Sequence, residues 1–321
     1  MKAIVIRENG GPEVLQMQDV EVPTIADGDL LIRTQTIGVN FIDCYQREGI
    51  YPVALPFIPG REGVGVVTEV GTGVSEFAVG DVVAWPFGDA GYAEYVRVPA
   101  RAVVRVPDGV SPESACALML QGMTAHYLVN STYKLAADEY VLVHAAAGGV
   151  GQILTRLAKL KGAVVIGTVS SDAKAEIARA AGVDHIIRYD YEDVAKRVRE
   201  IVPTGVHVVY DGVGKTTFDA SLACLRPRGM MVLFGGSSGQ VPAFDLQRLN
   251  AGGSLFITRP SLGHYTASPE ELKWRGSELF ELHRAGALPV EIGARFSLED
   301  AASAHQALEG RKTTGKVVLS V

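Results

Sequence analysis

A glycine-rich turn between a short apolar run and a helix is the part of this sequence with the most specific chemistry. The run Tyr140–His144 is followed by the hexapeptide 146–151, Ala-Ala-Gly-Gly-Val-Gly. Glycines at such a turn let the backbone approach a pyrophosphate and let the helix pack close to the strand. The free N–H groups at the helix start, at about Gly149, then bind the phosphate oxygens. Alanine replaces the first glycine of the G-x-G-x-x-G pattern. A helix expected at 152–161 and a strand at 164–169 nevertheless favour a dinucleotide site over a turn used only for packing.

The residues that follow the second strand indicate which dinucleotide is bound. An acidic residue about 20 positions past the turn usually binds the ribose hydroxyls of NAD. This sequence has Ser170 there, and Lys174 one helical turn later. A carboxylate would repel a 2′-phosphate, whereas a hydroxyl and an ammonium bind it, so we expect NADPH as the cofactor. Another interpretation makes Ser170 an N-cap and Lys174 a solvated helix residue. Both can hold together, because a helix N-terminus also attracts phosphate.

Strands and helices alternate regularly around this turn, as in a doubly wound sheet. Short apolar runs are separated by segments with helical character, and six parallel strands with helical crossovers make a complete dinucleotide-binding sheet. We therefore predict an α/β fold with a six-stranded Rossmann domain at residues 123–264. Its expected strands are 140–144, 164–169, 185–187, 206–210, 230–234 and 254–258.

The residues before this domain have a different pattern. They form short strands punctuated by glycine and proline, which predicts a small β-rich domain resembling a partly open barrel. The tail after residue 265 contains helix, strand, helix and strand, with no partner sheet of its own, so we expect it to join the first domain. That domain is then discontinuous, with residues 1–122 and 265–321. Its expected N-terminal strands are 2–7, 30–36, 63–70, 81–85 and 92–98.

Composition narrows the class of protein further. The chain of 321 residues is 47% hydrophobic and 21% charged, with a formal charge of −6, which are values of an ordinary globular protein. The acidic balance and the absence of a basic run argue against nucleic acid as a partner. No stretch reaches membrane-spanning length, and the N-terminus has too few apolar residues for a signal peptide. The three cysteines are far apart in the sequence and odd in number, which indicates free, reduced thiols. We therefore expect a cytoplasmic protein without a membrane partner.

Several segments together resemble one known superfamily over the whole chain. The sequence resembles the medium-chain dehydrogenase/reductase superfamily, with a GroES-like domain before the Rossmann domain. Within it, the sequence is most similar to the zinc-free NADPH:quinone oxidoreductases related to zeta-crystallin. The segments that carry the resemblance are 40–45 (NFIDCY), 49–52 (GIYP), 60–65 (GREGVG), 144–151 (HAAAGGVG), 210–214 (YDGVG), 234–239 (FGGSSG) and 258–262 (TRPSL).

The positions of the zinc ligands are changed in this sequence. Zinc-dependent members of the superfamily have a cysteine where this chain has Asn40, and Gly-His-Glu where it has Gly-Arg61-Glu. Asparagine is a poor zinc ligand and arginine is none, while catalytic zinc needs three protein ligands. Three cysteines also cannot supply the four-cysteine structural site. We therefore expect no metal, and an acceptor electrophilic enough to take hydride with only hydrogen bonds to help, such as a quinone.

The resemblance also implies a site assembled from distant segments. Tyr45 and Tyr51 are candidates to donate a hydrogen bond to the acceptor oxygen, although packing at a domain edge explains them equally well. The implied cofactor contacts are Asn40, Phe41, Ile42, Asp43 and Tyr45 beside the nicotinamide and ribose; Tyr127 from the first linking helix; Gly148, Gly149, Val150 and Gly151 at the pyrophosphate; Ser170, Lys174 and Tyr189 around the 2′-phosphate; and Val213, Phe234, Gly235, Gly236, Ser237, Ser238, Pro260, Ser261, Leu262 and Arg311 on the other side and over the nicotinamide half.

Three functions stay open from the sequence. The first is NADPH-dependent reduction of quinones by hydride or electron transfer in a cleft between two domains. The second is reduction of activated C=C bonds in enals, enones or enoyl thioesters, because the same metal-free hydride geometry serves both. The third is a structural or RNA-binding role like that of crystallin-related proteins. The apolar run 254–258 at the sheet edge predicts a homodimer, because a partner strand would cover the edge.

Overall fold

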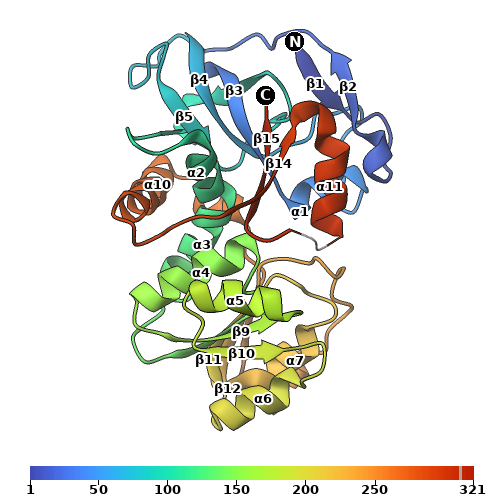
Figure 1. The fold of residues 1–321 in the computed structure, drawn as a ribbon, viewed down its shortest axis with the longest axis vertical. Helices are drawn as coiled ribbons and strands as arrows, with labels where there is room; N and C mark the ends of the chain where they lie inside the picture. Colours follow the sequence, from blue (N-terminus) through green and yellow to red (C-terminus); the bar gives the residue numbers. More distant parts are fainter. Residues whose placement is uncertain (311–312) are drawn as a thin grey trace. The chain divides into compact units, whose positions relative to one another are not determined.

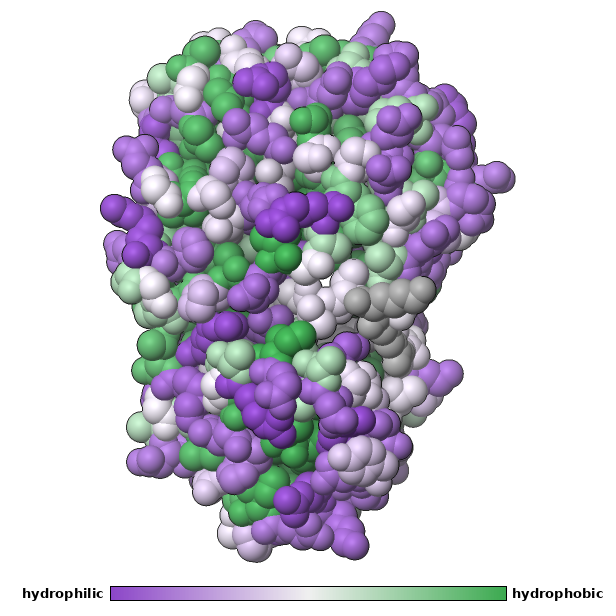
Figure 2. Space-filling model, in the orientation of Figure 1, coloured by the Kyte–Doolittle hydropathy of each residue, from purple (hydrophilic) through white to green (hydrophobic). Residues whose placement is uncertain are grey.

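The computed structural model describes residues 1–310 and 313–321, which form two compact units (Figure 1). The first contains Met1–Met123 together with Tyr265–Val321, and the second contains Thr124–His264. Among the described residues, no helix is both long and apolar enough to span a bilayer. Over the face drawn in Figure 2, hydrophilic residues predominate and hydrophobic residues are scattered between them, as is usual for the surface of a globular protein.

The second unit is built on a parallel sheet of six strands in the order β10-β9-β8-β11-β12-β13. The predicted Rossmann sheet is thus confirmed. The strand order reverses between β8 and β11, and ligands of such sheets bind at the carboxyl ends of the strands beside this switch point. The strands are β8 (Tyr140–Val143), β9 (Val164–Val169), β10 (His185–Arg188), β11 (Val206–Asp211), β12 (Leu225–Leu233) and β13 (Phe256–Thr258).

Helices cover this sheet and bury its apolar strands. Helices α4 and α5 contact β8, β9 and β10, whereas α6 and α7 contact each other and strands β10 to β12 (Figure 1). One core cluster joins Leu142 and Ile166 of the sheet to Val198 of α6 and Phe218 of α7. The helices that lie in this unit or begin or end at its boundaries are α3 (Met123–Tyr127), α4 (Gly149–Leu160), α5 (Asp172–Ala180), α6 (Val194–Ile201), α7 (Phe218–Cys224), α8 (Gln247–Ala251) and α9 (Leu262–Tyr265).

The first unit is organised around the long strand β3 (Asp29–Val39). Its main sheet has the order β14-β15-β3-β4-β5-β7, and β6 pairs with β3 as well. Strand β15 from the tail runs antiparallel to β3, with Val317 opposite Val39, so the tail completes the sheet of the N-terminal segment. The strands are β1 (Lys2–Val5), β2 (Gln16–Asp19), β4 (Glu62–Val70), β5 (Val82–Trp85), β6 (Tyr95–Pro99), β7 (Val104–Arg105), β14 (Ile292–Ser297) and β15 (Lys316–Ser320).

Four α-helices lie among the described residues of the first unit, besides those at its boundaries. Helix α1 (Phe41–Arg47) was not predicted; it begins at Asn40, which forms a capping box with Asp43. Helix α2 (Pro112–Ala117) has Ser111 as its N-cap, whose hydroxyl accepts a hydrogen bond from Ser114 N–H. The other two are α10 (Pro269–Arg284) and α11 (Ala301–Glu309).

Candidate cofactor and substrate sites

The glycine turn at the start of α4 leaves backbone donors without partners in the helix. The N-cap is Gly148, which has no side chain to cap the helix, and the first hydrogen bond of the helix runs from Gln152 N–H to the Gly148 carbonyl, 2.9 Å away. The N–H groups of residues 149–151 therefore have no acceptor within the helix. A Cβ at Gly151 would lie 2.4 Å from the Ala145 carbonyl oxygen. The turn thus requires a glycine at 151 and fits a pyrophosphate, which binds uncapped helix N-termini.

The end of β9 corrects one detail of the sequence interpretation. The N-cap of α5 is Ser171 and not Ser170, because the Ser171 hydroxyl accepts the hydrogen bond of Lys174 N–H at 3.3 Å. Ser170, which directly precedes this cap, is thus not the capping residue. Tyr189 lies beside it, since its N–H donates to the Val169 carbonyl at 3.2 Å. The structure therefore brings Ser170, Lys174 and Tyr189 to the same corner of the sheet.

A buried hydrogen-bond chain crosses the carboxyl edge of the sheet and was not predicted from the sequence. The Ser221 hydroxyl donates to the Asp211 carboxylate at 2.8 Å, so it accepts from His144 Nε2 at 3.0 Å. His144 Nδ1 then accepts from the Thr168 hydroxyl at 3.1 Å. This arrangement needs a neutral imidazole, and burial indeed lowers the pKa of His144. The chain fixes the ends of β8, β9 and β11 relative to one another.

Asp211 also organises the loop that follows β11. Its carboxylate accepts the N–H groups of Val213 at 2.8 Å and Gly214 at 3.0 Å. The Val213 carbonyl in turn accepts from Ser238 N–H and from the Ser238 hydroxyl, at 2.9 and 2.8 Å. The structure therefore brings Val213 together with the predicted loop 234–238. The sequence signal was the segment Tyr-Asp-Gly-Val-Gly, in which an aspartate ends an apolar strand just before a glycine turn.

In the first unit, helix α1 brings the predicted aromatic residues together. Phe41 and Tyr45 stack with ring centroids 6.2 Å apart, and Tyr45 meets Tyr51 edge to face at 5.4 Å. Tyr51 N–H also donates to the Tyr45 carbonyl at 3.1 Å. Tyr45 and Tyr51, both partly exposed, therefore form one aromatic pair.

The two positions that hold zinc in the metal-dependent relatives are occupied by other interactions. Asn40 Nδ2 donates to Glu62 at 2.6 Å, and Asn40 Oδ1 accepts from Lys316 Nζ at 2.9 Å. Lys316 also forms a buried ion pair with Glu62. Arg61 pairs with Asp89 in the loop after β5. Within residues 1–310 and 313–321, no group of three or more His, Cys, Asp or Glu side chains is arranged to hold a metal ion.

Asp43 lies at one end of a buried polar chain instead of facing outward from α1. Its Oδ2 accepts from Asn40 N–H at 2.9 Å and from the Tyr92 hydroxyl at 3.2 Å. Tyr92 then accepts from His305 Nε2 at 3.0 Å, and His305 Nδ1 accepts from Arg47 at 3.1 Å. The other carboxylate oxygen, Oδ1, is buried and has no partner among the described residues.

Burial shifts the pKa values of Asp43 and His305, the two members of this chain that flank Tyr92. The loss of hydration raises the pKa of Asp43 to about 7, against the opposing effects of the Asn40 N–H, Lys316 and Tyr92. The loss of hydration, helped by the positive charge of Arg47, lowers the pKa of His305 to about 3. Burial also raises the pKa of the Cys44 thiol, which makes this cysteine a poor nucleophile.

Other predicted site residues lie in varied surroundings. Tyr127 is buried, as are Pro260 and Leu262, while Ser261 between them is exposed. In the first unit Gln121 has a buried side-chain oxygen with no partner among the described residues. Arg311 lies outside the described residues.

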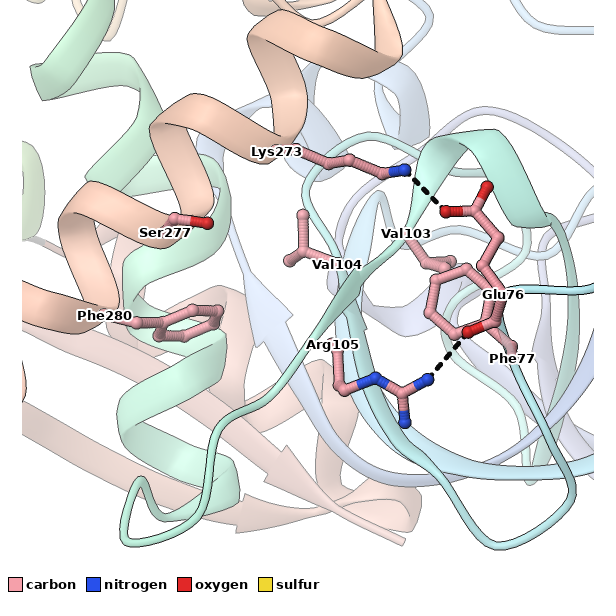
Figure 3. A pocket seen from close by; sticks show the side chains of 8 residues that line it. All are labelled: Glu76, Phe77, Val103, Val104, Arg105, Lys273, Ser277 and Phe280. Carbon is pink, nitrogen blue, oxygen red and sulfur yellow. Dashed lines mark hydrogen bonds and ion pairs between the residues drawn. The ribbon is translucent and has the colours of Figure 1, made fainter.

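A cavity of about 260 Å³ in the first unit contains none of the predicted site residues (Figure 3). It lies between α10 and β7. Lys273 on one side pairs with the Glu76 carboxylate at 2.5 Å, and Arg105 on the other donates to the Glu76 carbonyl at 2.7 Å. Both cations that line it are therefore already engaged, and the apolar side chains of Val104 and Phe280 also line it.

Comparisons with known proteins agree with this architecture. Residues 26–108 match the family model of the alcohol dehydrogenase GroES-like domain, and residues 149–273 match that of the zinc-binding dehydrogenases. A quinone oxidoreductase of Pseudomonas aeruginosa is 45% identical, covering 99% of both chains. A 2-haloacrylate reductase of Burkholderia sp. is 43% identical, covering 99% of this chain and 98% of its own. The structure of a mycobacterial protein complexed with NADPH is 49% identical, covers 100% of both chains and superimposes with a TM-score of 0.98.

A GroES-like unit joined to a six-stranded dinucleotide-binding sheet defines the medium-chain dehydrogenase/reductase architecture. With relatives this similar over their whole length, the chain belongs to that superfamily and, within it, to the branch of the quinone oxidoreductases.

Proposed function

We propose that this protein is an NADPH-dependent quinone reductase that works without a metal ion. The observation that carries the proposal is the corner of the second unit where an uncapped glycine N-terminus and the segment 170–174 lie at the ends of adjacent strands β8 and β9. The first fits a pyrophosphate and the second a 2′-phosphate. The NADPH-bound mycobacterial relative and the quinone oxidoreductase relative support the same cofactor and acceptor.

The cofactor, when bound, supplies the hydride, and the protein binds and orients it. In our proposal Gly148, Gly149, Val150 and Gly151 hold the pyrophosphate, while Ser170, Lys174 and Tyr189 hold the 2′-phosphate. The loops after β11, β12 and β13 line the nicotinamide half, with Val213 and the segments 234–238 and 260–262. The chain from Thr168 through His144 and Ser221 to Asp211 supports these loops, because it ties the strand ends together with satisfied hydrogen bonds.

In our proposal the acceptor binds to the predicted domain of residues 1–122 and 265–321, and the dinucleotide to the predicted domain of residues 123–264. Hydride addition to a quinone leaves an aromatic hydroquinone anion, which a hydrogen bond stabilises and one proton neutralises. Tyr45 on α1 and Tyr51 just after it are the hydroxyls that we propose for this bond, because their rings are paired and both side chains are partly exposed. Phe41 and Ile42 pack beside the nicotinamide in this proposal.

The zinc-free mechanism rests on what the ligand positions do in this chain. The amide of Asn40 is committed on both atoms, to Glu62 and to Lys316. Arg61, with its fixed positive charge, is paired with Asp89. Neither side chain is a ligand that zinc prefers. Transition-state stabilisation therefore falls to hydrogen bonds and to an acceptor that is itself electrophilic.

A second activity is favoured by one relative. The Burkholderia 2-haloacrylate reductase acts on an activated C=C bond and is nearly as similar as the quinone oxidoreductase. Turnover of 1,4-benzoquinone compared with an α,β-unsaturated ketone at equal NADPH distinguishes the two substrate classes.

We further propose a cytoplasmic homodimer that pairs through β13. This strand is the last of the sheet, and Phe256 on it is 55% exposed. An exposed apolar edge is a site for pairing with another strand, and a twofold partner would cover it.

The cofactor assignment is tested by replacing Lys174 with alanine. A charge-assisted hydrogen bond contributes roughly 1.5–3 kcal/mol, so Lys174→Ala should weaken NADPH binding about ten- to a hundredfold. Binding of NADH should change little, because NADH lacks the 2′-phosphate. The exposed Lys196 on α6 provides the matched control, since Lys196→Ala removes the same charge from another helix of this unit. Equal affinities of the parent protein for NADH and NADPH would contradict the proposal.

A further inference from the structure

Arg188 is a cation at the same corner of the second unit that the sequence did not single out. It ends β10, directly opposite Val169 at the end of β9. Its guanidinium donates through Nε and Nη2 to the two oxygens of Asp190, at 2.9 and 2.8 Å. It also pairs through Nη1 with Asp172, the first residue of α5. The side chain of Arg188 is only 13% exposed, whereas that of Asp172 is 96% exposed.

We propose that Arg188 is a specificity-determining residue for the 2′-phosphate, acting beside Ser170 and Lys174. This inference rests on the proposed function, which puts the phosphate at the end of β9. Arg188 reaches that place from the neighbouring strand, because its partner Asp172 follows the N-cap of the helix that carries Lys174. Tyr189, the next residue in the chain, is bonded to the Val169 carbonyl.

The guanidinium still has donors for a phosphate oxygen. It carries five N–H groups, and its bonds to Asp172 and Asp190 use one on each of the three nitrogens. One N–H on Nη1 and one on Nη2 are left by these bonds. A planar fork of this kind matches the geometry of a phosphate.

The two carboxylates have different roles in this arrangement. Asp190 holds the guanidinium through two parallel bonds and so fixes the plane of the fork. Asp172 holds it through one nitrogen only and is itself 96% exposed, so water can solvate its carboxylate when this bond is released. Arg188 can therefore exchange Asp172 for a phosphate at low cost. Without Arg188, both carboxylates would stand uncompensated near the phosphate and repel it.

The test uses 2′,5′-ADP and 5′-AMP as probes, because they differ only by the 2′-phosphate and need no nicotinamide site. Isothermal titration with the full chain gives the ratio of their dissociation constants. We expect the parent protein to prefer 2′,5′-ADP, and Arg188→Gln to weaken 2′,5′-ADP about tenfold with 5′-AMP unchanged. The control Arg197→Gln removes the same charge from α6, where Arg197 pairs with Glu200, and should leave the ratio unchanged.

Two further variants separate recognition from folding. Arg188→Lys keeps the charge but loses the fork, so it should recover only part of the lost preference. Asp172→Asn removes one negative charge and releases Nη1, so it should bind 2′,5′-ADP at least as tightly as the parent. A loss of 2′,5′-ADP affinity in Asp172→Asn as large as that in Arg188→Gln would overturn the inference, because it would show that the ion pair only maintains the local fold.

The same measurement distinguishes failure of this inference from failure of the proposed function. If the parent binds both probes equally, the 2′-phosphate site itself is misplaced. If the parent prefers 2′,5′-ADP and Arg188→Gln keeps the full preference, the phosphate site stands and only the role of Arg188 is refuted.

Discussion

The buried polar chain of the first unit predicts two opposite effects of pH on stability. Asp43 and His305 lie on either side of Tyr92 in this chain. Burial raises the pKa of Asp43 from its ordinary value of 3.8 to about 7. Between about pH 4 and 7, Asp43 is therefore protonated in the folded state and ionised in the unfolded state. Asp43 thus contributes stability that is full below pH 4 and is lost as the pH rises to about 7.

His305 has the opposite sign. Its pKa falls from an ordinary value of 6.5 to about 3 in the folded protein. Between pH 6.5 and about 3, the unfolded state therefore binds a proton at His305 and the folded state does not. The stability that His305 contributes is full above pH 6.5 and is lost as the pH falls toward 3. Between pH 4 and 6.5 the contribution of Asp43 falls with pH while that of His305 rises. The two pH dependences nearly cancel, so the stability of the parent protein shows neither of them.

Single substitutions should reveal each contribution. One pKa unit corresponds to about 1.4 kcal/mol, so the shift of Asp43 corresponds to roughly 4 kcal/mol. The isosteric Asp43→Asn imitates the neutral acid, and its stability relative to the parent should rise by about that amount from pH 4 to 7. His305→Gln imitates the neutral imidazole. Its stability relative to the parent should increase by about 3 kcal/mol as the pH is lowered from 6.5 to 4.

Tryptophan fluorescence during urea unfolding reports the free energy of unfolding of the first unit, which contains Asp43 and His305. Both tryptophans, Trp85 and Trp274, belong to the first unit. Asp27→Asn, which removes a carboxylate at an exposed position of the same unit, is the control. Flat difference curves for Asp43→Asn and His305→Gln, or curves with the same sign, would refute the reasoning.

The remaining predictions concern assembly, metal dependence and the buried ion pair. The parent should sediment as a dimer at micromolar concentration and Phe256→Asp as a monomer; a monomeric parent contradicts pairing through β13. Overnight treatment with a strong chelator should leave turnover unchanged and metal analysis should find no stoichiometric zinc, because Asn40 and Arg61 are poor ligands; activity lost and restored by Zn²⁺ contradicts this. Glu62→Gln should lower the free energy of unfolding by about 3–5 kcal/mol, because it leaves the buried charge of Lys316 unpaired; a change below about 1 kcal/mol would mean that the pair is hydrated.

The six-stranded sheet was predictable because each of its strands is a short apolar run between turn residues. Strand β9 runs from Val164 to Val169 as expected. Strand β12 was predicted to begin at Met230 but begins at Leu225. Its pairing with β11 is irregular, since Leu225 lies opposite Val206 and Met230 opposite Val208. An irregular register of this kind has no period-two signal for the sequence to display.

Helix α1 was missed for a different reason. Its seven residues include two aromatics and an isoleucine, which favour strands, and so short a helix shows little periodicity. The capping box between Asn40 and Asp43 determines its start. The pattern N-x-x-D is present in the sequence, but the same residues belong to the segment 40–45 that resembles a cofactor motif.

The contacts of the site could be predicted only where they are local. The turn before α4 and the segment 170–174 are short, and their chemistry follows from residue type and spacing. The chain from Thr168 through His144 and Ser221 to Asp211 joins four elements. Each of these residues has an ordinary structural role when considered alone. Only the parallel order of β9, β8 and β11 brings them to one edge.

The side chain at position 40 shows what the structure adds to a missing zinc ligand. The sequence shows only that a cysteine of the metal-dependent relatives is absent. The structure puts Asn40 between a buried carboxylate, Glu62, and a buried ammonium, Lys316. An amide satisfies both neighbours, because its NH₂ donates to the carboxylate and its oxygen accepts from the ammonium. A thiolate there would add a second negative charge beside Glu62 and could not donate to it. An asparagine at position 40 therefore satisfies the hydrogen bonds of this buried ion pair. That structural role does not depend on the cofactor.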